Sequence, residues 1–186
     1  MIEKMNRRQY LKENFRSSFQ FLGAVIGATI EQERNFIRPP GAGGNELLFL
    51  ATCNRCGACA DVCPTKTIGL FSVDYGAKLA GTPFINPNES PCTFCNQCIS
   101  HCPTGALEKI GPKEKLGVAE IFEFNCLAHK GTMCDYCIRA CPFGRNALSL
   151  VDGKPKVTEE NCNGCGLCVA ACIQTYKGIY VKALET

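Results

Sequence analysis

The sequence lacks the signatures of several common activities. It has no G-x-G-x-x-G or Walker run, so nothing in it indicates a nucleotide site. It has no C-x3-C-x2-C set, which radical enzymes use to leave one iron without a cysteine ligand. Outside the first 40 residues its lysines and arginines form no continuous run, and RNA-recognition signatures are absent, which excludes a nucleic-acid binder.

Cysteine is abundant, with 16 of 186 residues. The cysteines form four groups of four spaced C-x2-C-x2-C-x3-C, except that the first gap of the third group has seven residues. Proline follows the first three groups, Ile173 follows the fourth, and no cysteine is left over. In bacterial ferredoxins such a run gives three thiolates to one [4Fe-4S] cluster and a fourth to its neighbour, so we predict four clusters. The candidate iron ligands are Cys53, Cys56, Cys59, Cys63, Cys92, Cys95, Cys98, Cys102, Cys126, Cys134, Cys137, Cys141, Cys162, Cys165, Cys168 and Cys172.

Two other uses of the cysteines fit less well. Three cysteines at i, i+3 and i+6 place too many ligands in one loop for a single tetrahedral zinc ion. Disulfide frameworks usually belong to secreted chains under roughly 100 residues.

The formal net charge of +3 counts every cysteine as neutral. With four oxidised clusters bound, the net charge would be about −5, which also disfavours nucleic acid as a partner.

We expect a loop-rich α+β fold of ferredoxin-like iron–sulfur modules, arranged as two bacterial-type 2[4Fe-4S] units. The 18 glycines and 10 prolines suit loops that turn backbone N–H groups toward cluster sulfurs. The hydrophobic fraction of 46% includes the cysteines, so ligation replaces much of the apolar burial as the ordering force. Removal of iron is therefore expected to unfold residues 50–175.

The chain is expected to divide into an N-terminal region, residues 1–38, and a four-cluster domain, residues 39–186. The run RRQYLK at residues 7–12 matches the twin-arginine export pattern, and the apolar run at residues 19–30 suits the core of a signal peptide. That run has 12 residues, too few to span a bilayer. Export of a folded, loaded protein would protect the thiolates from oxidation. The alternative is a cytoplasmic amphipathic helix that docks on the cluster domain or on a membrane partner.

A short helix, residues 46–52, is expected to lead into Cys53, and residues 66–91 are expected to form an inserted loop with at most one strand. The predicted strands are residues 121–124, 148–151, 156–158 and 178–182. The second and third of these would pair across Asp152-Gly153. A short helix is expected after the fourth cysteine of each group, as at Thr104–Ala106.

The exchange of fourth cysteines requires the groups to pair, in one of two ways. Adjacent pairing joins the first group to the second and the third to the fourth. Nested pairing joins the first to the fourth and the second to the third. The long spacer before Cys92 sets the first group apart and favours nested pairing, in which Cys53, Cys56 and Cys59 would share a cluster with Cys172.

Other residues near the cysteines have simpler roles. His101 and His129 are expected to form hydrogen bonds or face solvent, because four thiolates already fill each cluster. Four aromatic residues of the cluster loops are expected to pack and exclude water, and these are Phe94, Tyr136, Phe143 and Tyr176.

Four features of the sequence occur together: the RRQYLK start, the segment Arg38-Pro39-Pro40-Gly41-Ala42, the four cysteine groups and the seven-residue gap of the third group. In these features the chain resembles the NapG/MauM ferredoxin-type proteins over roughly residues 6–176. The resemblance implies a periplasm-facing electron carrier. Such a carrier would dock on a membrane quinol-oxidising iron–sulfur protein and pass electrons toward a terminal reductase, such as periplasmic nitrate reductase.

Three functions remain open. The favoured hypothesis is a one-electron relay that is no enzyme itself, because four cysteines per cluster leave no iron position for a substrate. The second is a cytoplasmic maturation or chaperone protein for a molybdenum enzyme, which a functional export signal would argue against. The third is a structural iron–sulfur subunit of a membrane redox complex, associated peripherally or permanently with hydrophobic subunits.

Overall fold

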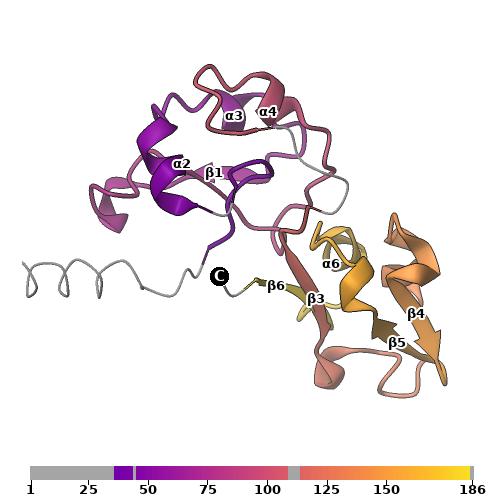
Figure 1. Ribbon diagram of the computed structural model, residues 1–186. Coiled ribbons are helices and arrows are strands. Elements are labelled where there is room, and N and C mark those ends of the chain that lie inside the picture. Colours follow the sequence, from indigo (N-terminus) through magenta and orange to yellow (C-terminus); the bar gives the residue numbers. More distant parts are fainter. Residues whose placement is uncertain (1–35, 44, 109–113, 185–186) are drawn as a thin grey trace, which may run out of the picture. The chain divides into compact units, whose positions relative to one another are not determined.

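Short helices and short strands follow one another along the chain (Figure 1). Most of the cysteines lie in the turns between these elements, and the others lie on short helices. The computed structural model describes residues 36–43, 45–108 and 114–184. Residues 35–186 form one compact unit. The export signal or docking helix expected in the N-terminal region lies outside the described residues, except for residues 36–38. Within the described ranges, no helix is both long enough and apolar enough to cross a membrane.

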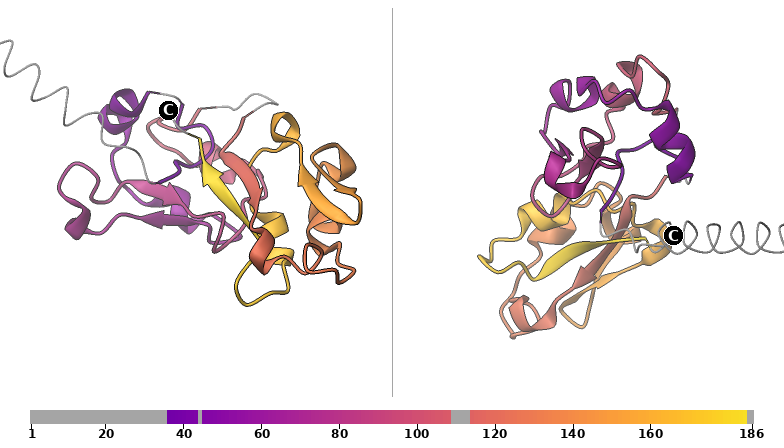
Figure 2. Two further views of the ribbon diagram at one scale, coloured as in Figure 1. Left: turned by 90° about the horizontal axis from the view of Figure 1, so that it is seen from below. Right: turned by 90° about the vertical axis from the view of Figure 1, so that its left-hand side faces the viewer.

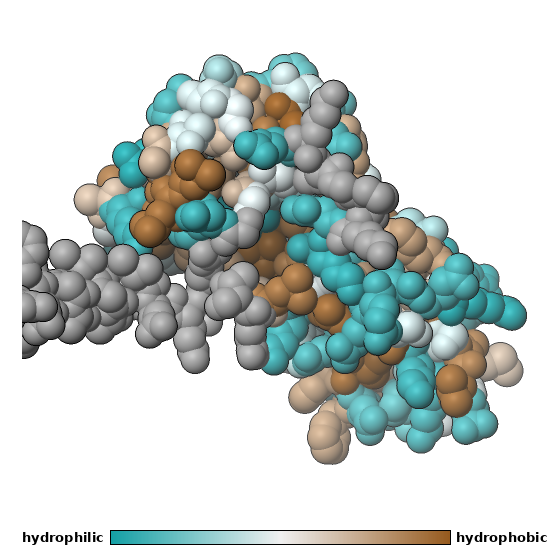
Figure 3. Space-filling model, in the orientation of Figure 1, coloured by the Kyte–Doolittle hydropathy of each residue, from teal (hydrophilic) through white to brown (hydrophobic). Residues whose placement is uncertain are grey.

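The first module, residues 45–108, combines three helices with one two-stranded sheet. The predicted helix is confirmed as α2, Glu46–Thr52, and the Asn45 side chain caps it by accepting a hydrogen bond from the Leu48 amide at 3.1 Å. α2 buries Phe49 and exposes Leu47 and Leu48, and Figure 3 shows hydrophobic surface over this helix. The remaining elements are α3, Ala58–Asp61; β1, Ile68–Leu70; a 3-10 turn, Val73–Tyr75; β2, Pro83–Ile85; and α4, Gln97–Ser100.

The second module, residues 114–184, has two antiparallel strand pairs. One joins β3, Gly117–Ile121, to β6, Ile179–Ala183, and the other joins β4, Leu148–Val151, to β5, Lys154–Val157. Its helices are α5, Tyr136–Ala140, and α6, Leu167–Ala171. Three 3-10 turns complete it, Glu123–Asn125, Gly144–Asn146 and Glu159–Asn161. The predicted β4–β5 hairpin and the closing strand are confirmed, with shifts of one or two residues at their ends.

Three details of the sequence prediction are wrong. The spacer at residues 66–91 contains two paired strands, β1 and β2, instead of at most one. The strand expected at residues 121–124 ends at Ile121, because the amides of Asn125 and Cys126 bond back to the Phe122 carbonyl and close a turn. The α-helices α3 to α6 precede the fourth cysteine of their groups, and of the short helices expected after it the described residues contain one, the 3-10 turn Gly144–Asn146 after Cys141. Proline disfavours a helical conformation in the residue before it, and Cys141 before Pro142 is extended.

The two modules contact each other directly, and they lie side by side in Figure 2. The Asn88 side chain accepts a hydrogen bond from the Val181 amide at 2.6 Å and donates one to the Val181 carbonyl at 2.9 Å. Ile37 packs against the hydrophobic cores of both modules. It also forms a β-bridge to Ile85, whose amide bonds to the Ile37 carbonyl at 2.8 Å.

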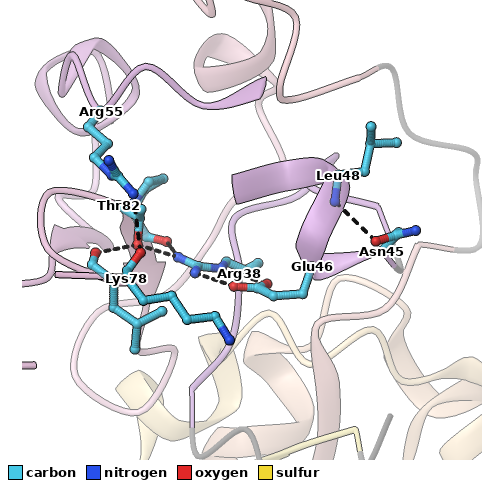
Figure 4. A network of polar contacts seen from close by, with 9 residues as sticks. Arg38, Asn45, Glu46, Leu48, Arg55, Lys78 and Thr82 are labelled. Atoms are coloured by element: carbon cyan, nitrogen blue, oxygen red, sulfur yellow. Dashed lines mark hydrogen bonds and ion pairs between the residues drawn. The ribbon is translucent and has the colours of Figure 1, made fainter. Parts of the chain in front are cut away.

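Arg38 connects the segment before the first module to that module through hydrogen bonds and an ion pair. Its guanidinium is buried and makes two contacts with the Glu46 carboxylate, at 2.5 and 3.2 Å. It donates to the Thr82 hydroxyl at 3.0 Å and also to the Pro83 carbonyl. Its Cζ lies 4.7 and 4.8 Å from the ring centroids of Phe36 and Phe49, within cation–π range. Figure 4 shows Arg38 directed between Glu46 and Thr82.

Replacing Arg38 with Met should destabilise the loaded protein strongly. The side chains of Arg38 and Glu46 are only 7% and 13% exposed, and removing one partner of a buried ion pair costs on the order of 3 kcal/mol. Arg139→Met is the control, because the Arg139–Asp135 pair is 76% and 37% exposed, and it should leave stability nearly unchanged. Anaerobic thermal unfolding, followed by circular dichroism, compares the two. Equal midpoints would contradict an anchoring role for Arg38.

Candidate iron–sulfur sites

All sixteen cysteines are free thiols, and they line four cavities with four cysteines each. The cavities are similar in size, with volumes between 330 and 380 Å³ that include the open space at their mouths. We number them by the group that supplies three of the four cysteines. Site I is lined by Cys53, Cys56, Cys59 and Cys102; site II by Cys63, Cys92, Cys95 and Cys98; site III by Cys126, Cys134, Cys137 and Cys172; and site IV by Cys141, Cys162, Cys165 and Cys168.

This grouping corrects the nested pairing. The cysteines of the first group meet Cys102 of the second group, and Cys172 meets the third group instead. The physical reason is the β1–β2 pair, which folds the long spacer back on itself. The Thr67 hydroxyl donates to the Pro91 carbonyl at 2.7 Å, and the Ser90 hydroxyl bonds to the Thr65 carbonyl. These contacts bring the end of the spacer back beside the first cysteine group. The length of the spacer therefore does not keep the first and second groups apart.

Pairs of short helices bring the exchanging groups together. α3 packs against α4 in the first module, and α5 packs against α6 in the second. Each helix carries the third cysteine of its group: Cys59, Cys98, Cys137 and Cys168. Each module therefore has the same internal arrangement, in which two cysteine loops face one another across a helix pair.

Burial, followed by the charge of neighbouring thiolates, raises the pKa of several thiols. The pKa of Cys98 and of Cys137 is raised to about 11, and the pKa of Cys168 is raised to about 12. Around Cys168 the neighbouring charges come from both site IV and Cys137. Four ionised thiols around one cavity therefore need a cationic group between them, and metal binding supplies it while releasing the thiol protons.

Hydrogen bonds to sulfur are present in both modules. The Ala119 amide donates to Cys162 Sγ, and the Gly178 amide donates to Cys172 Sγ, both at 3.4 Å. The Thr104 hydroxyl lies 3.8 Å from Cys102 Sγ. Burial alone raises the pKa of Cys102, but hydrogen bonds from the backbone of Leu107 and from Thr104 outweigh burial, so the net pKa is lowered.

The sites suit a polynuclear group better than one ion. Within residues 36–43, 45–108 and 114–184, no three His, Cys, Asp or Glu side chains are arranged to hold a single metal ion. Four thiols spread around each cavity, with N–H and O–H donors directed at some of the sulfurs, match the environment of a [4Fe-4S] core. When bound, such a core supplies one-electron redox chemistry.

The histidines and aromatic residues lie as follows. His101 Nδ1 bonds to the Gln97 carbonyl at 2.9 Å, and His129 Nδ1 lies 3.6 Å from Glu123, so each imidazole faces a protein oxygen. Phe94, Tyr136 and Phe143 line sites II, III and IV respectively. Phe94 packs against the core of the first module as expected, whereas Tyr136 and Phe143 are 52% and 43% exposed and exclude water less well than expected. Tyr176 lines none of the four sites and is 78% exposed.

Thr65 and Thr104 are site residues that the sequence reasoning missed. A signal was present, because Cys-Pro-Thr ends both of the first two groups, at residues 63–65 and 102–104. Each hydroxyl lies within 4 Å of the cysteine sulfur two residues earlier, at 3.6 and 3.8 Å. The third and fourth groups end in Cys141-Pro142-Phe143 and Cys172-Ile173-Gln174, which offer no hydroxyl there.

Comparison with known proteins agrees with the grouping in the structure. Two family models match, each described as a 4Fe-4S dicluster domain, over residues 52–106 and 126–173. The first match spans the cysteines of sites I and II, and the second spans those of sites III and IV.

Curated relatives cover most of the chain. The methylamine utilization ferredoxin-type protein MauM of Paracoccus denitrificans is 38% identical, over 86% of this chain and 77% of the relative. The ferredoxin-type protein NapG of Escherichia coli is 32% identical, over 96% of this chain and 86% of the relative. The ferredoxin-type protein NapF of Haemophilus influenzae is 32% identical, over 92% of this chain and 91% of the relative.

Thr104→Val should lower the reduction potential of the group at site I by tens of millivolts, because a net hydrogen bond to sulfur is lost. Thr65→Val should act in the same direction at site II, because the Thr65 hydroxyl lies 3.6 Å from Cys63 Sγ and its hydrogen bond contributes to the lowered pKa of Cys63. Thr52→Val is the control and should leave the potentials unchanged, because the Thr52 hydroxyl donates to the Leu48 carbonyl at 2.9 Å. Anaerobic redox titration followed by electron paramagnetic resonance (EPR) measures the three variants. An unchanged potential at site I in Thr104→Val would refute the role of this hydrogen bond.

Proposed function

Because the chain belongs to the family of MauM and NapG ferredoxin-type proteins, we propose that it is an electron relay carrying four [4Fe-4S] clusters. The sixteen cysteines would be the ligands, distributed as in sites I to IV. The division into an N-terminal region, residues 1–38, and an α+β four-cluster domain, residues 39–186, is part of this proposal.

The observation that carries the proposal is the set of four cavities with four cysteines each. Four thiolates satisfy the four irons of a [4Fe-4S] core, so no iron position is left for a substrate. The protein's own residues hold the clusters, limit water access and donate hydrogen bonds to sulfur. This is the chemistry of a carrier that takes up and releases single electrons.

The proposed donor is a membrane quinol-oxidising iron–sulfur protein, and the proposed acceptor is a terminal reductase of the periplasmic nitrate reductase type. These partners are what the resemblance to the NapG/MauM ferredoxin-type proteins implies, and relatives of both names match most of the chain. The RRQYLK run at residues 7–12 supports twin-arginine export, which would place the relay in the periplasm or against the membrane.

Anaerobically purified protein should contain about sixteen irons and sixteen acid-labile sulfides per chain, as four [4Fe-4S] cores require. Chemical analysis together with Mössbauer spectroscopy measures both the count and the cluster type. About eight irons would contradict the four-cluster proposal, and so would zinc in place of iron.

An Arg7→Lys, Arg8→Lys variant should remain in the cytoplasm while the native chain reaches the periplasm, because the export route requires both arginines. An Arg145→Lys variant serves as the control, since Arg145 is exposed, lies outside the export motif and lines none of the four sites. Fractionation of cells that express each chain gives the result. Retention of the native chain in the cytoplasm would overturn the compartment and favour a cytoplasmic carrier.

A further inference from the structure

A direct contact joins the cysteines of the two modules. The Cys92 amide donates a hydrogen bond to the Cys165 carbonyl at 2.8 Å. Cys92 lines site II in the first module, and Cys165 lines site IV in the second. The two thiols are also close enough for their charges to repel each other. Sites II and IV therefore share a boundary, although the third cysteine group lies between them in sequence.

The chain around this contact is tightly packed. Gly166 follows Cys165 in a left-handed conformation, with φ of +82°, and a β-carbon there would lie 2.1 Å from the Pro87 carbonyl oxygen. The Leu116 amide bonds to the Asn163 carbonyl at 2.9 Å. That bond lies within the second module and holds the loop of the fourth group beside β3, while the two hydrogen bonds between Asn88 and Val181 join the segment before Cys92 to β6. The packing of the fold therefore keeps sites II and IV close together.

Within each module, the third cysteines of the two groups lie near each other. The charges of Cys59 and Cys98 interact across sites I and II. The charges of Cys137 and Cys168 interact in the same way across sites III and IV. These cysteines lie on the packed helix pairs α3–α4 and α5–α6. The cysteine contacts thus connect I to II, II to IV, and IV to III.

From these three contacts we infer that electrons cross the protein in the order I, II, IV, III or its reverse, and that the Cys92–Cys165 junction is the bridge between the modules. The inference rests on the proposed function. With clusters held by the cysteines of sites II and IV, one electron would pass across the bridge from the reduced group of one site to the oxidised group of the other, and no bond or proton would change place. The external reductant is the one-electron donor of the relay, and the external oxidant is its acceptor. Sites I and III are the two ends of the path.

The order of sites can be tested by magnetic coupling, without any assay of turnover. Neighbouring reduced clusters broaden each other's EPR signals, whereas a cluster with no neighbour gives a simple signal of one spin. Four variants of the full chain each remove one site: Cys56→Ala, Cys95→Ala, Cys134→Ala and Cys162→Ala. Iron analysis should first show a loss of about four irons from the native sixteen in each.

Loss of an interior site should isolate one cluster. Cys95→Ala should leave site I uncoupled, and Cys162→Ala should leave site III uncoupled, each giving one simple spin per protein after full reduction. Loss of an end site, in Cys56→Ala or Cys134→Ala, should give no isolated spin. If all four variants give an isolated spin, the modules are magnetically independent and the junction is wrong. If Cys95→Ala gives none, site I borders the second module and the order is wrong.

Two glycine variants test the junction while keeping every cysteine. Gly166 and Gly131 have nearly the same backbone conformation, with φ of +82° and +84°, but a β-carbon at Gly131 meets no atom within 4 Å. Gly166→Ala should therefore weaken the coupling between modules and keep the coupling within them, whereas Gly131→Ala should match the native spectrum. An unchanged spectrum in Gly166→Ala at full iron content would overturn the inference. A native content near eight irons would instead defeat the four-cluster proposal, so the two failures are distinguishable.

Discussion

The exchange of the fourth cysteine between neighbouring groups is the constraint on which the structure depends. Cys102 completes the cavity of the first group, and Cys63 completes that of the second. Neither loop can form its site without the other, and Cys141 and Cys172 impose the same condition on the second module. Burial and the charges of neighbouring thiolates raise the pKa of Cys168 to about 12, so ionising all the thiols of a cavity is favourable only with a cationic core between them.

The rest of the fold positions these interlocked loops. The β1–β2 pair returns the long spacer to its starting point, and the buried Arg38 ties the preceding segment to α2 and β2. Asn88 and the Cys92–Cys165 hydrogen bond hold the modules together. The residues that join the modules also bring sites II and IV close, so the stability of the fold and the inferred electron path depend on the same contacts.

The sequence predicted the chemistry better than the arrangement. Cysteine spacing identified all sixteen cysteines that line the cavities, and local patterns identified α2 and the β4–β5 hairpin. The pairing was wrong because spacer length says nothing of whether a spacer folds back, and three-residue strands such as β1 give little periodic signal. The contacts of Asn88 with Val181 and of Gly166 with Pro87 join residues far apart in sequence, so only the folded chain reveals them.

Hydrogen exchange of the loaded and the iron-free protein tests the central claim most directly, that cluster ligation is the main force ordering residues 50–175. Iron would be removed anaerobically with a chelator, and amide exchange would be followed by mass spectrometry. We predict that protection is lost throughout residues 50–175, including the paired strands β3 and β6. Native-like protection of those strands without iron would show that apolar packing suffices and would contradict this account.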